Sequence, residues 1–268
     1  MLALSWYAAF HIGFVRRADH NILWGFAGLK RPGLDSVTRF TAGLCDPQPY
    51  VFLAAVPILV ALVRRRPRAA VTVGLIMLGA NVTSQLLKPL WALPRAFPGP
   101  PVFIVSGSWP SGHATAAMAL ALGAVIAAPP RLRPGVGAAM AAFVVAVCYS
   151  FLELGWHYPS DVLGGFLVAT NWALLGAAVL WWVDARHPVR RRELSPTGGG
   201  QVSVGEALAP MGVLVLGALL LAGVIALARP HAVIAYASVH KTFIAGAAMI
   251  GVLVMSVATA ATLALRRS

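Results

Sequence analysis

The sequence predicts an all-α membrane protein, a polytopic bundle of helices. Of its 268 residues 59% are hydrophobic and only 11% are charged, and apolar runs repeat along nearly the whole chain. This composition is typical of proteins that cross a membrane several times. Alanine, leucine and valine follow one another directly, so the apolar–polar alternation of a membrane β-barrel is absent from the sequence. The expected spans are therefore helices.

A helix needs about 20 apolar residues to cross a hydrocarbon layer of ~30 Å. Seven runs approach this length and a shorter run precedes them. We expect spans at residues 2–15, 50–63, 69–91, 111–129, 135–156, 160–183, 203–228 and 240–265. The first run is followed by Arg16 and Arg17 and has no small-residue cleavage site, so we interpret it as a helix and not as a signal peptide.

A net charge of +13 could indicate nucleic-acid binding, but the positions of the arginines argue against it. They gather in loops that fall on one side of the membrane if the spans alternate, namely 64–68, 131–133, 186–192 and 266–267. Short basic loops of this kind face the cytoplasm and touch anionic headgroups. We therefore expect membrane lipids and no nucleic acid as partners, in a multi-pass protein of the plasma membrane. The loop 16–49 is basic yet falls on the outer side, where three aspartates partly offset its charge.

Three units follow from these patterns. Residues 1–185 hold six expected spans, 186–202 form a basic linker rich in Pro and Gly on the cytoplasmic side, and 203–268 form an appendage of two transmembrane helices. The appendage has no carboxylate inside its apolar runs, so we expect it to pack or to face lipid.

Three short polar strings interrupt the first unit: KPLWALPRA at 88–96, PSGH at 110–113 and SFLELGWHYPSD at 150–161. Each lies at the end of an apolar run, opposite the basic loops. They can therefore meet at the extracytoplasmic face.

In PSGH, a proline suited to a first helical turn precedes a helical run that begins at Ala114. Ser111, Gly112 and His113 then lie at a helix N-terminus, where free amides favour an anion. His113 would stand beside that anion and could give a proton to a departing oxygen. A structural helix cap would explain the string equally well if it stood alone.

In HYPSD, His157 and Asp161 are four residues apart where a helix starts at Pro159. The carboxylate can orient the imidazole, which leaves the other ring nitrogen free to attack phosphorus. A structural pair is the alternative, but ionisable groups near a membrane boundary are costly and usually functional. Lys88 and Arg95 could clamp the phosphate oxygens, or could simply extend to the membrane interface.

The three strings resemble the signature of the type 2 phosphatidic acid phosphatase superfamily, which reads Lys-x6-Arg-Pro, Pro-Ser-Gly-His and Ser-Arg-x5-His-x3-Asp. The likeness covers about residues 19–183. It implies a six-helix phosphatase core that needs neither metal nor cofactor. By this resemblance Lys88, Arg95, Ser111 and Gly112 bind phosphate, and the catalytic residues are His113 as general acid, His157 as nucleophile and Asp161 as its orienter. The last two helices have no counterpart in that core.

Two positions depart from the signature. Ala96 replaces a proline, which only loosens a turn. Phe151 replaces an arginine whose fork would hold two phosphate oxygens, so the phosphate pocket must differ. Glu153 would weaken anion binding further if it faced the site.

Three hypotheses follow. The first is a lipid phosphate phosphatase acting through a phosphohistidine on phosphatidic acid, phosphatidylglycerol phosphate or a polyprenyl diphosphate. The second is a phosphotransferase that passes the group to an alcohol, favoured by the apolar lining at Phe151 and Trp156. The third is a non-catalytic binder or transporter of phosphorylated lipids, suggested by the missing arginine.

Overall fold

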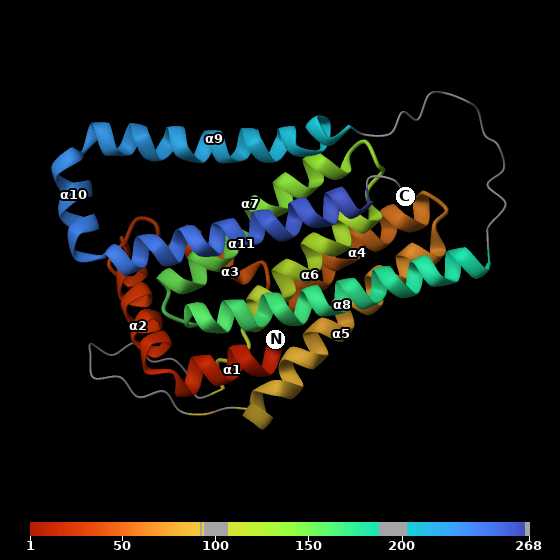
Figure 1. Cartoon of the computed structure of the whole chain (residues 1–268), viewed down its shortest axis with the longest axis horizontal. Coiled ribbons are helices and arrows are strands. Elements are labelled where there is room, and N and C mark those ends of the chain that lie inside the picture. The colour runs from red at the N-terminus through yellow and green to blue at the C-terminus, as the bar shows by residue number, and fades with distance from the viewer. Residues whose placement is uncertain (92, 94–106, 188–202, 266–268) are drawn as a thin grey trace.

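The computed structural model describes residues 1–91, 93, 107–187 and 203–265, which form eleven helices and no strand (Figure 1). In chain order these are α1 (Leu2–His11), α2 (Gly13–Ala27), α3 (Asp35–Gly43), α4 (Pro47–Val63), α5 (Pro67–Trp91), α6 (Gly112–Ala127), α7 (Arg133–Glu153), α8 (Pro159–Arg186), α9 (Val204–Ala228), α10 (Pro230–Val239) and α11 (Lys241–Leu265). The predicted all-α class is confirmed. Most of the expected linker, residues 188–202, lies outside the described residues.

Five of the described helices, α5, α7, α8, α9 and α11, are long and apolar enough to cross a membrane. The pair α3 and α4, bent by 58° at its break, would make a sixth span. With 16 residues, α6 is a shorter apolar helix, about 24 Å long. The chain is therefore an integral membrane protein that crosses the bilayer several times.

The expected first span at 2–15 is wrong. The helix ends at His11 because Ile12 adopts an extended conformation, and a new helix starts at Gly13. Ten residues reach only about 15 Å, half of the hydrocarbon layer. Instead of crossing the membrane, α1 packs against α2 and α8, and Trp6 donates a hydrogen bond to the backbone carbonyl of Trp91 (3.1 Å).

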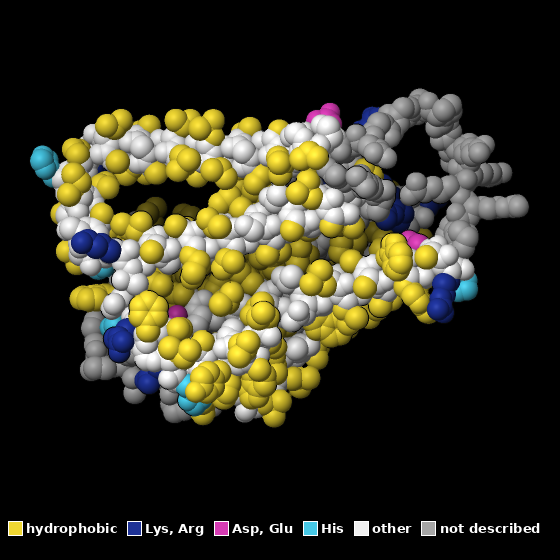
Figure 2. All heavy atoms as spheres, in the orientation of Figure 1, with side chains coloured by type: hydrophobic (Ala, Val, Ile, Leu, Met, Phe, Trp, Pro, Cys, Tyr) yellow, Lys and Arg dark blue, Asp and Glu magenta, His cyan; other side chains and the backbone are white. Residues whose placement is uncertain are grey.

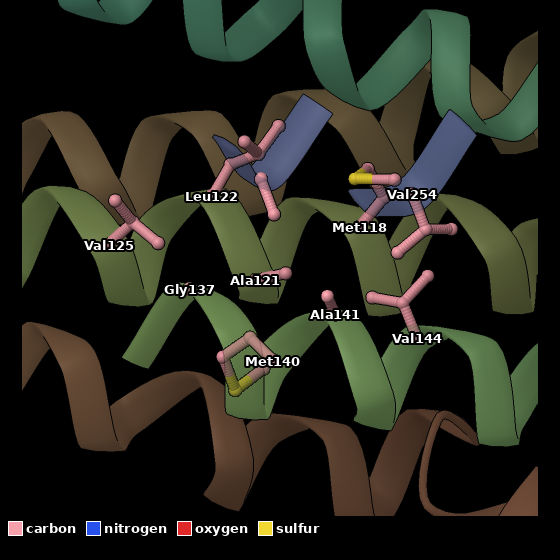
Figure 3. Close-up of a pocket in the computed structure, with 10 residues that line it drawn as sticks. Met118, Ala121, Leu122, Val125, Gly137, Met140, Ala141, Val144 and Val254 are labelled. Atoms are coloured by element: carbon pink, nitrogen blue, oxygen red, sulfur yellow. The ribbon is translucent and has the colours of Figure 1, made fainter. Parts of the chain in front are cut away.

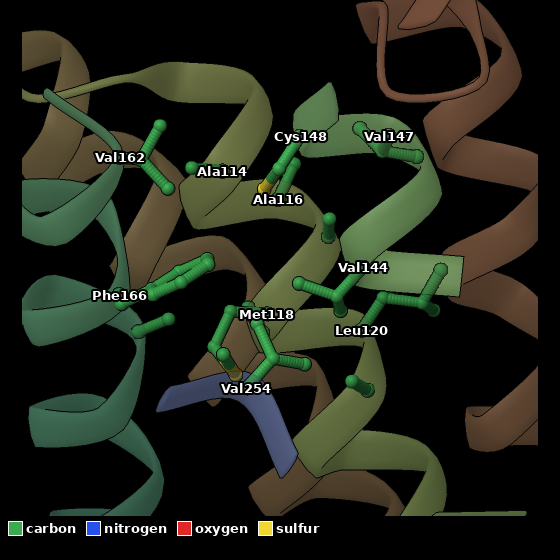
Figure 4. Packing of buried hydrophobic residues seen from close by; sticks show 14 of the residues in the cluster. Ala114, Ala116, Met118, Leu120, Val144, Val147, Cys148, Val162, Phe166 and Val254 are labelled. Carbon is green, nitrogen blue, oxygen red and sulfur yellow. The ribbon is translucent and has the colours of Figure 1, made fainter. Parts of the chain in front are cut away.

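The centre of the bundle is α6, which packs against α4, α5, α7, α8 and α11. Thirteen of its sixteen residues are buried, and many are alanines, whose small side chains let neighbouring helices approach closely. Figure 4 shows Ala114 and Met118 of this helix among Val144 of α7 and Phe166 of α8. The catalytic candidates of PSGH thus stand at one end of the most buried helix, whose position is fixed from every side.

Helices lie crosswise at the end of the bundle where α8 begins (Figure 1). There α2 packs against α7, α8 and α11, and the Tyr236 hydroxyl of α10 donates a hydrogen bond to the carbonyl of Gly25 in α2. On the face shown in Figure 2, Lys and Arg side chains gather at both ends and the flank between them is apolar. At the opposite end Arg68 forms an ion pair with Asp184 (2.9 Å).

The C-terminal helices differ in how they are buried. Only Ala207 and Met211, near its start, are buried in α9, whereas α11 buries a stripe of residues against α2, α6 and α7. A small pocket lies between α6, α7 and α11, lined by apolar residues such as Met118, Met140 and Val254 (Figure 3). No side chain around it could bind a phosphate, so it is not a candidate site.

Candidate active site

The N-terminus of α6 is built by the PSGH motif as the sequence predicts. Ser111 is the N-cap residue, and its hydroxyl accepts a hydrogen bond from the amide of Ala114 (3.2 Å). The side chain of Ser111 is fully buried. Gly165 of α8 lies against this turn so closely that a Cβ there would be 2.7 Å from the carbonyl oxygen of Ser111. The glycine thus lets α8 contact the end of α6 directly.

The N-terminus of α8 holds the third motif, and the helix begins at Pro159 as predicted. The Asp161 carboxylate is fully buried and accepts a hydrogen bond from the amide of Tyr158 (2.9 Å). The same oxygen, Oδ2, lies 3.6 Å from Nδ1 of His157. This arrangement directs the second ring nitrogen of His157, Nε2, away from the carboxylate.

The two histidines face each other across the junction of these helix ends. The ring centroids of His113 and His157 are 5.9 Å apart, with planes inclined at 61°. Phe151 is fully buried and its ring lies 5.9 Å from that of His113 and 5.3 Å from that of His157. The ring of Trp156 lies tilted against that of His113, with 5.4 Å between the centroids. The position of the signature arginine is therefore filled by an aromatic ring that touches both imidazoles.

The first motif reaches the same place through Lys88, one turn from the end of α5. A Cβ built on Gly112 would lie 3.4 Å from Nζ of Lys88 and 3.3 Å from Nε2 of Gln85. Lys88 and Gln85 are three residues apart and share a helix face. The Lys88 ammonium and the Gln85 side-chain amide therefore both approach the N-terminus of α6, where free backbone N–H groups would bind an anion. Arg95 lies outside the described residues.

Two carboxylates that the motifs do not contain also contact these helix ends. Asp46 Oδ1 is 3.0 Å from Nε2 of His113. Asp19, which is buried, accepts hydrogen bonds from the amide (2.9 Å) and the hydroxyl (2.6 Å) of Ser160. In the sequence both stand out only as charges of an outer loop. The signal that could have singled them out was an acidic residue next to an apolar helix, where an ionisable group is costly.

Glu153 faces α3 and not the phosphate site, so it does not weaken anion binding there. Its Oε2 accepts a hydrogen bond from the hydroxyl of Thr38 (3.4 Å). Within the described ranges no three His, Cys, Asp or Glu side chains gather in a way that could hold a metal ion.

Comparison with known proteins agrees with the motifs. Residues 69–187 match the family model of the PAP2 superfamily, and this segment contains all three strings. No curated protein matches the chain. Among solved structures, the crystal structure of a transmembrane PAP2-type phosphatidylglycerolphosphate phosphatase from Bacillus subtilis superposes with a TM-score of 0.58 and 22% identity, over 71% of this chain and 95% of that one. At this identity the superposition shows the fold alone. The resemblance drawn from the three strings is thus confirmed over residues 69–187, which match the PAP2 superfamily, and the chain shares the fold of a PAP2-type membrane phosphatase.

Proposed function

We propose that the protein is an integral membrane phosphatase that hydrolyses a phosphomonoester or diphosphate of a lipid. The observation that carries the proposal is the meeting of two imidazoles, 5.9 Å apart, at the N-terminal ends of α6 and α8. Backbone amides at such ends favour an oxyanion, and Lys88 approaches the same turn at Gly112. The substrate class is phosphatidic acid, phosphatidylglycerol phosphate or a polyprenyl diphosphate.

The first half of the reaction transfers the phosphoryl group to the enzyme. Nε2 of His157 attacks phosphorus while Asp161, 3.6 Å from Nδ1, stabilises the cationic ring. The bond between phosphorus and the oxygen of the leaving group breaks, and its electron pair stays on that oxygen. The leaving group is the lipid alcohol of a monoester or the lipid monophosphate of a diphosphate. His113 donates a proton to the departing oxygen. Lys88, Arg95, Ser111 and Gly112 bind the remaining phosphate oxygens.

The second half releases inorganic phosphate. Water attacks phosphorus and gives its proton to His113, which now acts as a base. The phosphorus–nitrogen bond breaks and its electrons return to the ring of His157. The site lies at the end of the bundle opposite the Arg68–Asp184 ion pair. With the basic loops in the cytoplasm, we place it at the extracytoplasmic face of the plasma membrane.

The test is release of inorganic phosphate from the three lipid classes by purified protein in detergent. The wild type should hydrolyse at least one of them and the His157→Ala variant none. A phosphoenzyme trapped with labelled substrate should be stable in alkali and labile in acid, and should be absent from the variant. Wild-type release without such an adduct, or an unchanged rate in the variant, would remove the phosphohistidine mechanism.

A phosphotransferase is the second candidate, and Phe151 favours it. An apolar ring in contact with both histidines disfavours water beside the phosphohistidine more than an arginine would. In that case an alcohol accepts the phosphoryl group in the second half. Turnover that requires an added alcohol would support transfer, and phosphate release without an acceptor would support hydrolysis.

A further inference from the structure

Asp46 stands at the N-cap position of α4, but its side chain does not cap that helix. An aspartate at this position ordinarily accepts a hydrogen bond from an amide of the first turn. Here the carboxylate instead places Oδ1 3.0 Å from Nε2 of His113. The backbone of Asp46 is held on both sides, since its amide donates to the carbonyl of Gly43 (3.0 Å) and its own carbonyl accepts from Tyr50 (2.9 Å).

The bend between α3 and α4 explains how this carboxylate reaches the site. The helix axes turn by 58° at residues 44–46. On either side of the bend α3 packs against α7 and α4 packs against α6. The turn therefore lies over the start of α6, where His113 projects, and the position of Asp46 is fixed by the packing of four helices.

The contact determines which ring nitrogen of His113 can donate a proton to the substrate. With Nε2 directed at the carboxylate, a neutral ring carries its proton there, and a cationic ring presents Nδ1–H to an oxygen on the other side. A carboxylate in hydrogen-bond contact stabilises that cation, which is the form that gives up a proton. His157 has the complementary arrangement, because its carboxylate lies at Nδ1 and leaves Nε2 free.

We propose that Asp46 is a positioning residue for the general acid, holding His113 in the tautomer and charge state that protonates the leaving oxygen of the lipid. This inference rests on the proposed function and deepens it. It adds a second carboxylate–imidazole pair to the pair of His157 and Asp161, and the carboxylate of this second pair lies outside the three motifs. The Asp46 side chain is 52% exposed and that of His113 21% exposed. Water therefore reaches the carboxylate, and its effect falls short of that of a fully buried ion pair.

The experiment compares two amphiphiles with the same alkyl chain and the same phosphate, one an alkyl phosphate and the other a nitrophenyl phosphate. The alkoxide needs a proton to depart and the nitrophenolate does not. General acid catalysis contributes about 10²- to 10⁴-fold. We expect Asp46→Asn to lower kcat/KM for the alkyl phosphate about tenfold or more, and for the nitrophenyl phosphate by less than about threefold.

Two further variants separate this role from folding. Asp46→Ser removes the carboxylate but supplies a good N-cap for α4, so its loss on the alkyl phosphate cannot come from a weakened helix. Asp35→Asn is the matched control, since Asp35 pairs with Arg39 (2.7 Å) at the start of the adjacent α3. It should leave the ratio of the two rates unchanged.

Equal losses on both substrates in the Asp46→Asn and Asp46→Ser variants, or no loss in either, would overturn the role of Asp46. Phosphate release by the wild type would in that case still support the proposed phosphatase function. If the wild type releases phosphate from neither amphiphile nor from any of the lipids, the proposed function fails, and this inference fails with it.

Discussion

The backbone amide of Ser111 donates a hydrogen bond to the backbone carbonyl of Asp161, with 3.0 Å between nitrogen and oxygen. Ser111 caps α6 and Asp161 lies in the first turn of α8, so this bond joins the second and third motifs. Because it involves main-chain atoms, it fixes the two helix ends independently of the side chains. The distance between His113 and His157 is therefore set by the contact of α6 with α8.

That contact predicts a large effect for Gly165→Ala. A Cβ at this position would lie 2.7 Å from the carbonyl oxygen of Ser111 and 3.0 Å from the amide nitrogen of Thr115. Both are backbone atoms, which cannot turn aside as a flexible side chain could. The two helix ends must separate, and we expect phosphate release to fall about 100-fold, as a displacement of about 1 Å at a reacting centre can cause. The measurement is kcat/KM on the preferred lipid, together with the melting temperature in detergent.

Gly212→Ala is the matched control, because Gly212 lies within α9 and nothing stands within 4 Å of its Cβ position. Alanine is the better helix former by about 1 kcal/mol, so this variant should melt at the same or a higher temperature and keep full activity. If Gly165→Ala behaves like Gly212→Ala, α8 can shift without disturbing the site.

The buried carboxylate of Asp19 predicts a loss of stability when it is removed. In Asp19→Ala the amide and hydroxyl of Ser160 lose their acceptor inside the protein. An unsatisfied buried polar group costs about 1–3 kcal/mol. We expect the free energy of unfolding in mild detergent to fall by about that amount, and activity to fall with it because Ser160 precedes Asp161.

A double-mutant cycle isolates the interaction. Ser160→Ala alone should also destabilise, and the double variant should lose less than the sum of the two single losses. Asp184→Asn, in an exposed ion pair at the other end, should change stability by less than about 1 kcal/mol. Additive losses would show that Asp19 and Ser160 do not stabilise each other.

Local chemistry explains what could be predicted of the site. The α8 helix begins at Pro159 as expected, and Ser111, Gly112 and His113 form the N-terminus of α6 as expected. Pro110, however, precedes the N-cap Ser111 and is not in the first helical turn. Motif spacing then places His157 and Asp161 four residues apart, close enough to meet across one turn. Such features depend on neighbours in the chain and can be deduced from the sequence.

Contacts between distant segments could not be predicted. Asp46 is 67 residues from His113, and Asp19 is 141 residues from Ser160. Both contacts depend on how the helices pack, and hydropathy does not predict that packing. The expected first span was wrong for a related reason. Apolar composition shows which residues prefer lipid, but not that the backbone turns at Ile12.

Removal of metal ions gives a further prediction. The proposed reaction uses two imidazoles and two cationic side chains, and no step requires a metal. Phosphate release should therefore be unchanged after treatment with EDTA and gel filtration into chelator-treated buffer. Loss of activity that magnesium restores would contradict the metal-free mechanism.

The ring of Phe151 offers the sharpest test of the altered phosphate pocket. In Phe151→Arg a guanidinium replaces a fully buried ring in contact with both histidines. Without an anion this charge lacks a counterion and should lower the melting temperature.

With orthovanadate, which mimics the trigonal-bipyramidal phosphate, the fork can bind two oxygens. A hydrogen bond to a charged group contributes about 1.5–3 kcal/mol, so vanadate should bind about tenfold tighter or more and raise the melting temperature further than in the wild type. Phe151→Leu keeps the pocket apolar and should show no such gain. Equal vanadate shifts in the Arg and Leu variants would mean that a side chain at position 151 does not reach the oxyanion, and that the chain's departure from the signature leaves phosphate binding unaltered.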